Sequence, residues 1–110
     1  MVTWPDLLAS RLIDNGETLD DIVAWKFAQG HDKWTYTNGS IVWASDVSFP
    51  SKEFLVEFDD DYGSSQGIPF YVWTKEFVYF PGVYDGNEWV DSVPRNPRED
   101  GPPPCHVGGE

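Results

Sequence analysis

The run from Ile68 to Pro97, IPFYVWTKEFVYFPGVYDGNEWVDSVPRNP, constrains the fold more than any other stretch, because it combines eight of the chain's 18 aromatic residues with a hairpin signal. That signal is Asp85-Gly86, a dipeptide typical of a two-residue type I′ turn. Such a turn fixes the strand register and predicts the pairs Tyr84–Asn87, Gly82–Trp89 and Phe80–Asp91. We expect the whole run from Ile68 to Pro97 at the centre of an antiparallel sheet, with Phe80, Tyr84 and Trp89 on the core face of the hairpin.

A further strand, from Ile68 to about Thr74, precedes this hairpin. Pro94 and Pro97 end the second strand of the hairpin. Pro81 lies inside the first strand of the hairpin. Because proline has no N–H to donate to a ladder, that strand is predicted to be at an edge or bulged at this position.

Two short helices are predicted ahead of the sheet. The first runs from Thr3 to Asn15, with Asp6 in capping-box register and an apolar stripe of Trp4, Leu7, Leu8 and Leu12. The second begins at Thr18, has Asp21 at the equivalent box position, and ends at Gly30. Its expected common side holds Leu19, Ile22, Val23, Lys26 and Phe27. Helices this short need burial of their apolar stripes, and the sheet can supply it.

Residues 34–43, WTYTNGSIVW, predict a second hairpin around Asn38-Gly39. Its expected pairs are Thr37–Ser40, Tyr36–Ile41 and Trp34–Trp43. The alternation from Glu53 to Asp59 predicts another strand, and DDDYGSSQG, residues 59–67, is typical of a surface loop.

Together these elements predict an α+β fold: two short N-terminal helices packed on an antiparallel sheet of five to six strands built from hairpins. We expect a single α+β domain over residues 1–93. Residues 94–110 are rich in proline and glycine, lack apolar periodicity and are predicted to form a mostly disordered tail.

Charge restricts the possible partners. The chain has 19 acidic and seven basic side chains, a net charge of −12. Such a surface repels nucleic-acid phosphates and anionic membranes and attracts basic proteins. The single cysteine, Cys105, excludes an internal disulfide, and neither a signal peptide nor a membrane span is predicted. We therefore expect a cytoplasmic protein.

The carboxylates of Glu57, Asp59, Asp60 and Asp61 are the first candidates for chemistry. Their spacing begins like a calcium loop, but Gly63 and Phe70 stand where ligands are required. A solvated acidic loop is the favoured interpretation, and a small metal-dependent hydrolase is the alternative.

The remaining candidates for catalysis are isolated. Cys105 and His106 lie in the tail without a second cysteine, and His31 follows the predicted end of a helix. The chain contains no GxSxG, P-loop, HExxH or GxGxxG motif. The sequence favours a non-enzymatic protein that needs no cofactor or metal.

Three acidic groups are the candidate protein-binding residues: Asp20 with Asp21, Glu57 with Asp59, Asp60 and Asp61, and Asp85 with Glu88 and Asp91. We expect each group to be exposed. If they converge on one face, they imitate the phosphate charge of a DNA duplex and can occupy a basic nucleic-acid-binding surface. If they are dispersed, they serve only solubility.

The run from Tyr79 to Pro97, YFPGVYDGNEWVDSVPRNP, resembles a segment of small uncharacterised proteins from actinobacteria and their phages. Its most particular residues are the YDGNEW turn and the VPRNP terminus. The resemblance covers under a fifth of the chain and implies no activity. It favours a phage-type accessory protein that acts in the cytoplasm of the host cell.

The leading hypothesis is a non-enzymatic acidic protein-binding module that inhibits or modulates a basic, nucleic-acid-binding partner. We expect a monomer or homodimer without direct contact to nucleic acid or membrane. The alternatives are the metal-dependent hydrolase and a structural or assembly protein that dimerises through its sheet.

Overall fold

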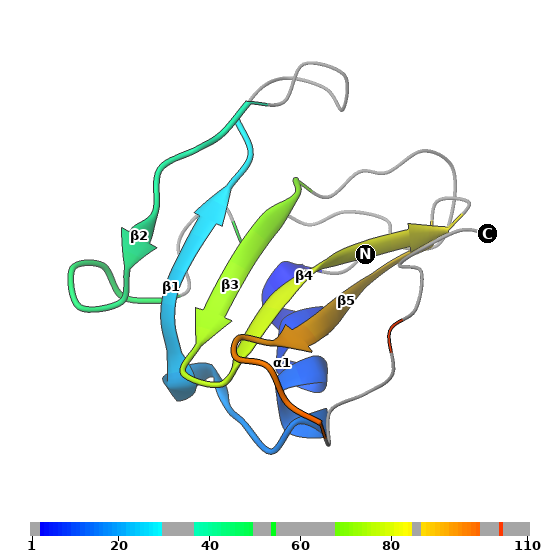
Figure 1. Ribbon diagram of the computed structural model, residues 1–110. Coiled ribbons are helices and arrows are strands. Elements are labelled where there is room, and N and C mark those ends of the chain that lie inside the picture. The colour runs from blue at the N-terminus through cyan, green and yellow to red at the C-terminus, as the bar shows by residue number, and fades with distance from the viewer. Residues whose placement is uncertain are drawn as a thin grey trace.

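The computed structural model describes residues 3–29, 37–49, 54, 68–84, 87–99 and 104. These residues form an α+β fold of one α-helix and a five-stranded antiparallel sheet, with the strand order β2-β1-β3-β4-β5. The elements are α1 (Trp4–Asp14), the 3-10 turn η1 (Leu19–Asp21), β1 (Ile22–Phe27), β2 (Val42–Trp43), β3 (Phe70–Thr74), β4 (Phe77–Tyr84) and β5 (Asn87–Pro94). The helix lies against one face of the sheet (Figure 1).

The first predicted helix is confirmed as α1. Thr3 is its N-cap, and the Asp6 carboxylate accepts a hydrogen bond from the Thr3 backbone N–H at 3.2 Å. Gly16 follows the helix with φ at 75°, a conformation that favours glycine. The buried side chains of the helix are Trp4, Leu8 and Leu12. The local capping signals and the apolar stripe therefore determine this helix.

The second predicted helix is wrong. Its cap is present, because the Thr18 backbone N–H donates to Asp21 at 2.8 Å, but the turn that it starts ends at Asp21. The next six residues, IVAWKF, form β1 and pair with β3. Their β-branched and aromatic side chains are favoured in strands, and the ladder with β3 outweighs the helical spacing.

The hairpin of β4 and β5 has the predicted register, including Tyr84–Asn87, Gly82–Trp89 and Phe80–Asp91. The prediction for its core face is wrong for Phe80 and Trp89. Tyr79 and Val90 are buried, whereas the alternate side chains of Phe80 and Trp89 lie on the other face, and the Tyr84 side chain is outside the described residues. Register does not decide which face is covered, and α1 covers the face of Tyr79 and Val90.

The position of Pro81 agrees with its chemistry. β3 pairs with β4 at Val72–Tyr79 and Trp73–Val78, and at Pro81 the partner of β4 is Val90 on β5. Beyond Tyr79, the side of β4 that faces β3 is therefore a local edge, as the sequence predicts.

The predicted pair Thr37–Ser40 is wrong, because Thr37 forms its bridge with Gln29. The predicted pairs Tyr36–Ile41 and Trp34–Trp43 involve Trp34 and Tyr36, which lie outside the described residues. On its described side, Trp43 pairs with Ala24. A type I′ turn requires a positive φ at its glycine, and Gly39 does not have one. A Cβ at Gly39 would instead collide with the Phe27 carbonyl oxygen. This glycine serves a close backbone approach to β1.

The core lies between α1 and the sheet, and it is rich in aromatic side chains. Its buried members are Trp4, Leu8, Leu12, Ile22, Trp25, Phe54, Phe70, Val72, Tyr79 and Val90. The Phe54 side chain is fully buried in this core, and its ring centroid lies 4.3 Å from that of Phe27. The rest of the strand predicted from Glu53 to Asp59 and the loop at 59–67 lie outside the described residues.

Arg95, at the start of the predicted tail, makes two hydrogen bonds to the end of β3 and the turn that follows it. The Arg95 backbone N–H donates to the Glu76 carbonyl oxygen at 2.9 Å, and its guanidinium donates to the Thr74 carbonyl at 2.7 Å. Most of the predicted tail, with Cys105 and His106, lies outside the described residues, as does His31. No described helix is long and apolar enough to cross a membrane.

Candidate binding surface and pocket

The sheet has one row of side chains on each face that crosses all five strands. The inner row, which faces α1, is Val42, Trp25, Val72, Tyr79 and Ser92. The outer row is Trp43, Ala24, Trp73, Val78 and Val93. Directly paired residues share a face, so the register by itself places these two rows on opposite sides. Four members of the inner row are buried.

The outer row is apolar although it lies away from the helix (Figure 1). Trp43 is 52% exposed and Val93 is 45% exposed, while the small Ala24 is buried between its two tryptophan neighbours. Tyr71, on the same face, is 48% exposed and its ring lies 5.9 Å from that of Trp73. Contiguous exposed apolar surface of this kind is typical of an interaction site.

Trp89 extends this surface toward the end of the β4–β5 hairpin. Its cross-strand partner is Gly82, and a Cβ at that position would lie 2.6 Å from the indole ring. The glycine therefore lets the indole lie against the backbone of β4. Together with Phe80 and Tyr71, Trp89 and the outer row form what we call the outer aromatic face.

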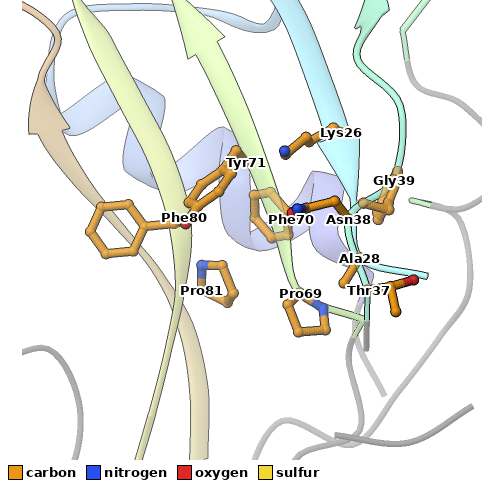
Figure 2. A pocket seen from close by; sticks show the side chains of 11 residues that line it. Lys26, Ala28, Thr37, Asn38, Gly39, Pro69, Phe70, Tyr71, Phe80 and Pro81 are labelled. Carbon is orange, nitrogen blue, oxygen red and sulfur yellow. The ribbon is translucent and has the colours of Figure 1, made fainter. Parts of the chain in front are cut away.

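A pocket of about 480 Å³ opens beside this face, where β3 and β4 diverge (Figure 2). Its lining comes from β1, β3, β4 and the segment 37–39: Lys26, Phe27, Ala28, Thr37, Asn38, Gly39, Pro69, Phe70, Tyr71, Phe80 and Pro81. The pocket begins where the β3–β4 ladder ends, after the pair Val72–Tyr79.

Pro81 explains why the ladder ends there. Pro69 accepts a hydrogen bond from Ala28 across the β1–β3 pair, so Phe70, the next residue, directs its backbone groups toward β4. The residue on β4 in register with Phe70 is Pro81, which has no N–H to donate. The two strands separate at this point and the space between them becomes the pocket.

Lys26 supplies the positive charge of the pocket. It is directly opposite Tyr71 in the β1–β3 pair, and Figure 2 shows its side chain extending toward that residue. The ion pairs between described residues are both made by Arg11, with Asp14 and Asp91. Lys26 is therefore a half-buried cation without a carboxylate partner among the described residues, in a strongly acidic chain.

A polar network on the inner face attaches α1 to the sheet. The Tyr79 hydroxyl donates to the Glu17 carboxylate at 2.5 Å and accepts from the Asn15 amide at 3.1 Å. Asn15 and Arg11 both donate to the Ser92 hydroxyl. Burial, and then the hydrogen bond to Glu17, raise the pKa of the Tyr79 hydroxyl well above its usual range. Because these groups satisfy one another, their role is structural.

The predicted acidic residues that the structure describes, Asp20, Asp21, Glu88 and Asp91, do not meet on one face. Asp20 and Asp21 are exposed, as expected, near the sheet end where Ile22 pairs with Thr74. Glu88 lies toward the other end of the sheet, opposite Val83, and is only 4% exposed. The expectation that Glu88 is exposed is wrong, because its strand position directs it to the covered face.

Asp91 is half-buried and accepts a hydrogen bond from Arg11 at 3.5 Å and from the Ser92 backbone N–H at 2.9 Å. The other predicted binding residues, Glu57, Asp59, Asp60, Asp61 and Asp85, lie outside the described residues.

Sequence reasoning missed an acidic cleft of about 540 Å³ at the end of α1. Its charged lining is Asp14, Glu17, Asp21, Glu76 and Arg98. Of these, only Asp21 was a candidate, because the others are spread over three segments with no local pattern. No group of His, Cys, Asp or Glu among the described residues is arranged to hold a metal ion.

Comparisons with protein-family models, with curated proteins and with solved structures gave no match to this chain. The outer aromatic face and the pocket beside it therefore have to be interpreted from their own chemistry.

Proposed function

We propose that this protein is a non-enzymatic acidic binding module that docks a basic protein partner on its outer aromatic face. The observation that carries the proposal is the outer row, which leaves Trp43 and Val93 about half exposed on the side of the sheet away from α1. Tryptophan and tyrosine are the side chains that most often dominate protein–protein affinity.

The charge of the chain favours a basic partner over a second copy. A homodimer would bring together two chains of net charge −12, and their repulsion opposes association. A basic surface is attracted by the same field, which accelerates encounter and suppresses acidic competitors. The aromatic face then supplies apolar burial, and the acidic groups steer the partner.

The outer edge of β5, which has no neighbouring strand among the described residues, is a poor alternative for docking. Its outward-directed Ser92 N–H already donates to the Asp91 carboxylate, and Pro94, two residues on, has no N–H. Such features block the addition of another strand. We therefore assign docking to the face rather than to this edge.

In this proposal the protein inhibits or modulates its partner by covering the partner's basic surface, which in a nucleic-acid-binding protein is the surface that contacts phosphates. The resemblance of Tyr79 to Pro97 to actinobacterial and phage proteins supports a phage-type accessory role in the host cell. Asp20 and Asp21 are the described acidic candidates that are free to contribute, since both are exposed.

The test is affinity capture from an actinobacterial lysate at low and high salt, with the double variant Trp43→Ser/Tyr71→Ser beside the wild type. Ile13→Ser is the matched control, because Ile13 is 69% exposed on α1. We expect the wild type and the control to retain the same basic protein at low salt and to release it at high salt. With that partner purified, the double variant should bind about 30-fold more weakly or worse, as for a hot spot of about 2 kcal/mol.

Equal capture by the double variant would refute docking on this face. Capture of an acidic partner, or binding that does not depend on salt, would refute the proposal that the acidic charge of the chain attracts a basic partner. A concentration-dependent dimer in light scattering that the double variant abolishes would favour the assembly alternative instead.

A further inference from the structure

We infer that the pocket between β3 and β4 binds a small organic acid, consisting of a carboxylate attached to an apolar ring. This ligand site goes beyond the proposed partner surface. It rests on three features of the pocket: walls shaped by the backbone, an apolar lining, and one cation without a carboxylate partner among the described residues.

The walls of the pocket are set by the backbone rather than by adjustable side chains. On the β4 side, Pro81 prevents the ladder with β3 from continuing, so the opening is a consequence of covalent structure. On the β1 side, Gly39 lies so close to the Phe27 carbonyl that no Cβ fits between them. A pocket built in this way is largely preformed, as small-molecule sites usually are.

The lining divides into an apolar part and a polar part. Tyr71 contributes an aromatic ring, Pro69 and Pro81 contribute saturated rings, and the Phe80 ring points from β4 away from β3 (Figure 2). The polar groups are the Lys26 ammonium, the Asn38 amide and the Thr37 and Tyr71 hydroxyls, and no carboxylate lines the pocket among the described residues. A few polar groups in an apolar cavity of about 480 Å³ are typical of a ligand site.

Lys26 differs from the other described cations. Arg11 is paired with Asp14 and Asp91, Arg95 donates to the Thr74 carbonyl, and Lys75 is exposed in the turn between β3 and β4. Arg98 lines the acidic cleft at the end of α1. Lys26 alone extends from a central strand into a pocket. The Lys26 ammonium forms no ion pair with any carboxylate that the structure describes, and we assign it to an external anion.

A carboxylate suits this site better than a neutral group. It accepts charge-assisted hydrogen bonds from the Lys26 ammonium and a second bond from the Asn38 amide, while its apolar body contacts Tyr71 and Pro81. An inorganic anion would leave the rings unused, and an uncharged aromatic compound would leave the ammonium without a counter-ion.

The test uses phenylpropionate and its neutral analogue phenylpropionamide as probes, with binding followed by chemical shifts in NMR spectra. We expect the acid to shift resonances of Lys26, Tyr71 and Pro81, and the amide to bind at least about tenfold more weakly. Lys26→Met retains the side-chain volume without the charge and should lose the preference for the acid. Lys75→Met makes the same charge change outside the pocket and should keep it.

Three results would overturn the site: equal affinity for acid and amide, an unchanged preference in Lys26→Met, or no shift of pocket resonances with the acid at millimolar concentration. Folding of Lys26→Met is checked by its spectrum, and Lys26→Arg, which should retain the preference, serves as a second variant. Tyr71 belongs to both surfaces, but the two tests are separate because Lys26→Met and Lys26→Arg leave Trp43 and Tyr71 unchanged and are measured with the acid and the amide rather than with the protein partner.

Discussion

Replacement of Tyr79 by phenylalanine tests how the polar network holds α1 on the sheet. The hydroxyl donates to the charged Glu17 at 2.5 Å and accepts from Asn15 at 3.1 Å, and the ring is fully buried. After the substitution, Glu17 still accepts from the Thr74 hydroxyl and Asn15 still donates to Ser92. Each partner therefore keeps one bond, which limits the cost of the change.

A hydrogen bond to a charged group contributes about 1.5–3 kcal/mol and a neutral one about 1 kcal/mol. With the partners partly satisfied, we expect Tyr79→Phe to lower the free energy of unfolding by about 2–3 kcal/mol. Urea denaturation at neutral pH measures this, and an unchanged m-value shows that both states keep their compactness. Tyr71→Phe is the control, because that hydroxyl is on the exposed outer face, and its change should stay within about 0.5 kcal/mol.

The raised pKa of Tyr79 adds a dependence on pH. A group whose pKa is higher in the folded state binds its proton more tightly there, so its contribution is complete below the unfolded value of about 10 and is lost as the pH rises above it. We expect the difference between wild type and Tyr79→Phe to be constant below this pH. Above it, the difference should shrink by up to about 1.4 kcal/mol per pH unit.

Two results would refute this reasoning. A loss below about 0.5 kcal/mol in Tyr79→Phe would show that the network does not stabilise the fold. Parallel stability curves for the two proteins above pH 10 would show that the hydroxyl has its ordinary pKa in the folded state.

Two further substitutions test single structural features by urea denaturation. Gly39→Ala should destabilise by more than about 2 kcal/mol, because its Cβ collides with the Phe27 carbonyl and β1 must shift; a neutral effect would contradict the close approach. Asp6→Ala should cost about 1 kcal/mol, because α1 loses the acceptor of the Thr3 N–H and hydroxyl, and Asp14→Ala at the other end of the helix is the control. Equal effects of the two aspartate substitutions would argue against the cap.

Local signals in the sequence were sufficient where the structure depends on neighbouring residues. The Thr3–Asp6 box and the Asn15-Gly16 stop define α1, and β4 pairs with β5 in the register that the Asp85-Gly86 dipeptide predicts. The edge position of Pro81 also followed from its missing N–H. In each case the deciding interaction spans only a few residues or is a property of one residue.

The same kind of signal failed where a distant strand competed with it. Thr18–Asp21 is a valid helix cap, yet Ile22 leads into β1 because β3, almost 50 residues later, offers a ladder. Asn38-Gly39 is a valid turn dipeptide, yet its glycine is used for contact with Phe27. The composition of IVAWKF was the one signal that could have indicated the strand.

The candidate sites depend on tertiary structure even more. The sequence determined the acidic charge, the strand alternation and the proline that interrupts β4. Only the packing of α1 against one face decided that Tyr79 and Val90 are core and that Trp43, Phe80 and Trp89 belong to the outer aromatic face. Alternation defines two faces but not which of them is buried, because that choice depends on the free energy of docking a remote helix rather than on any local preference.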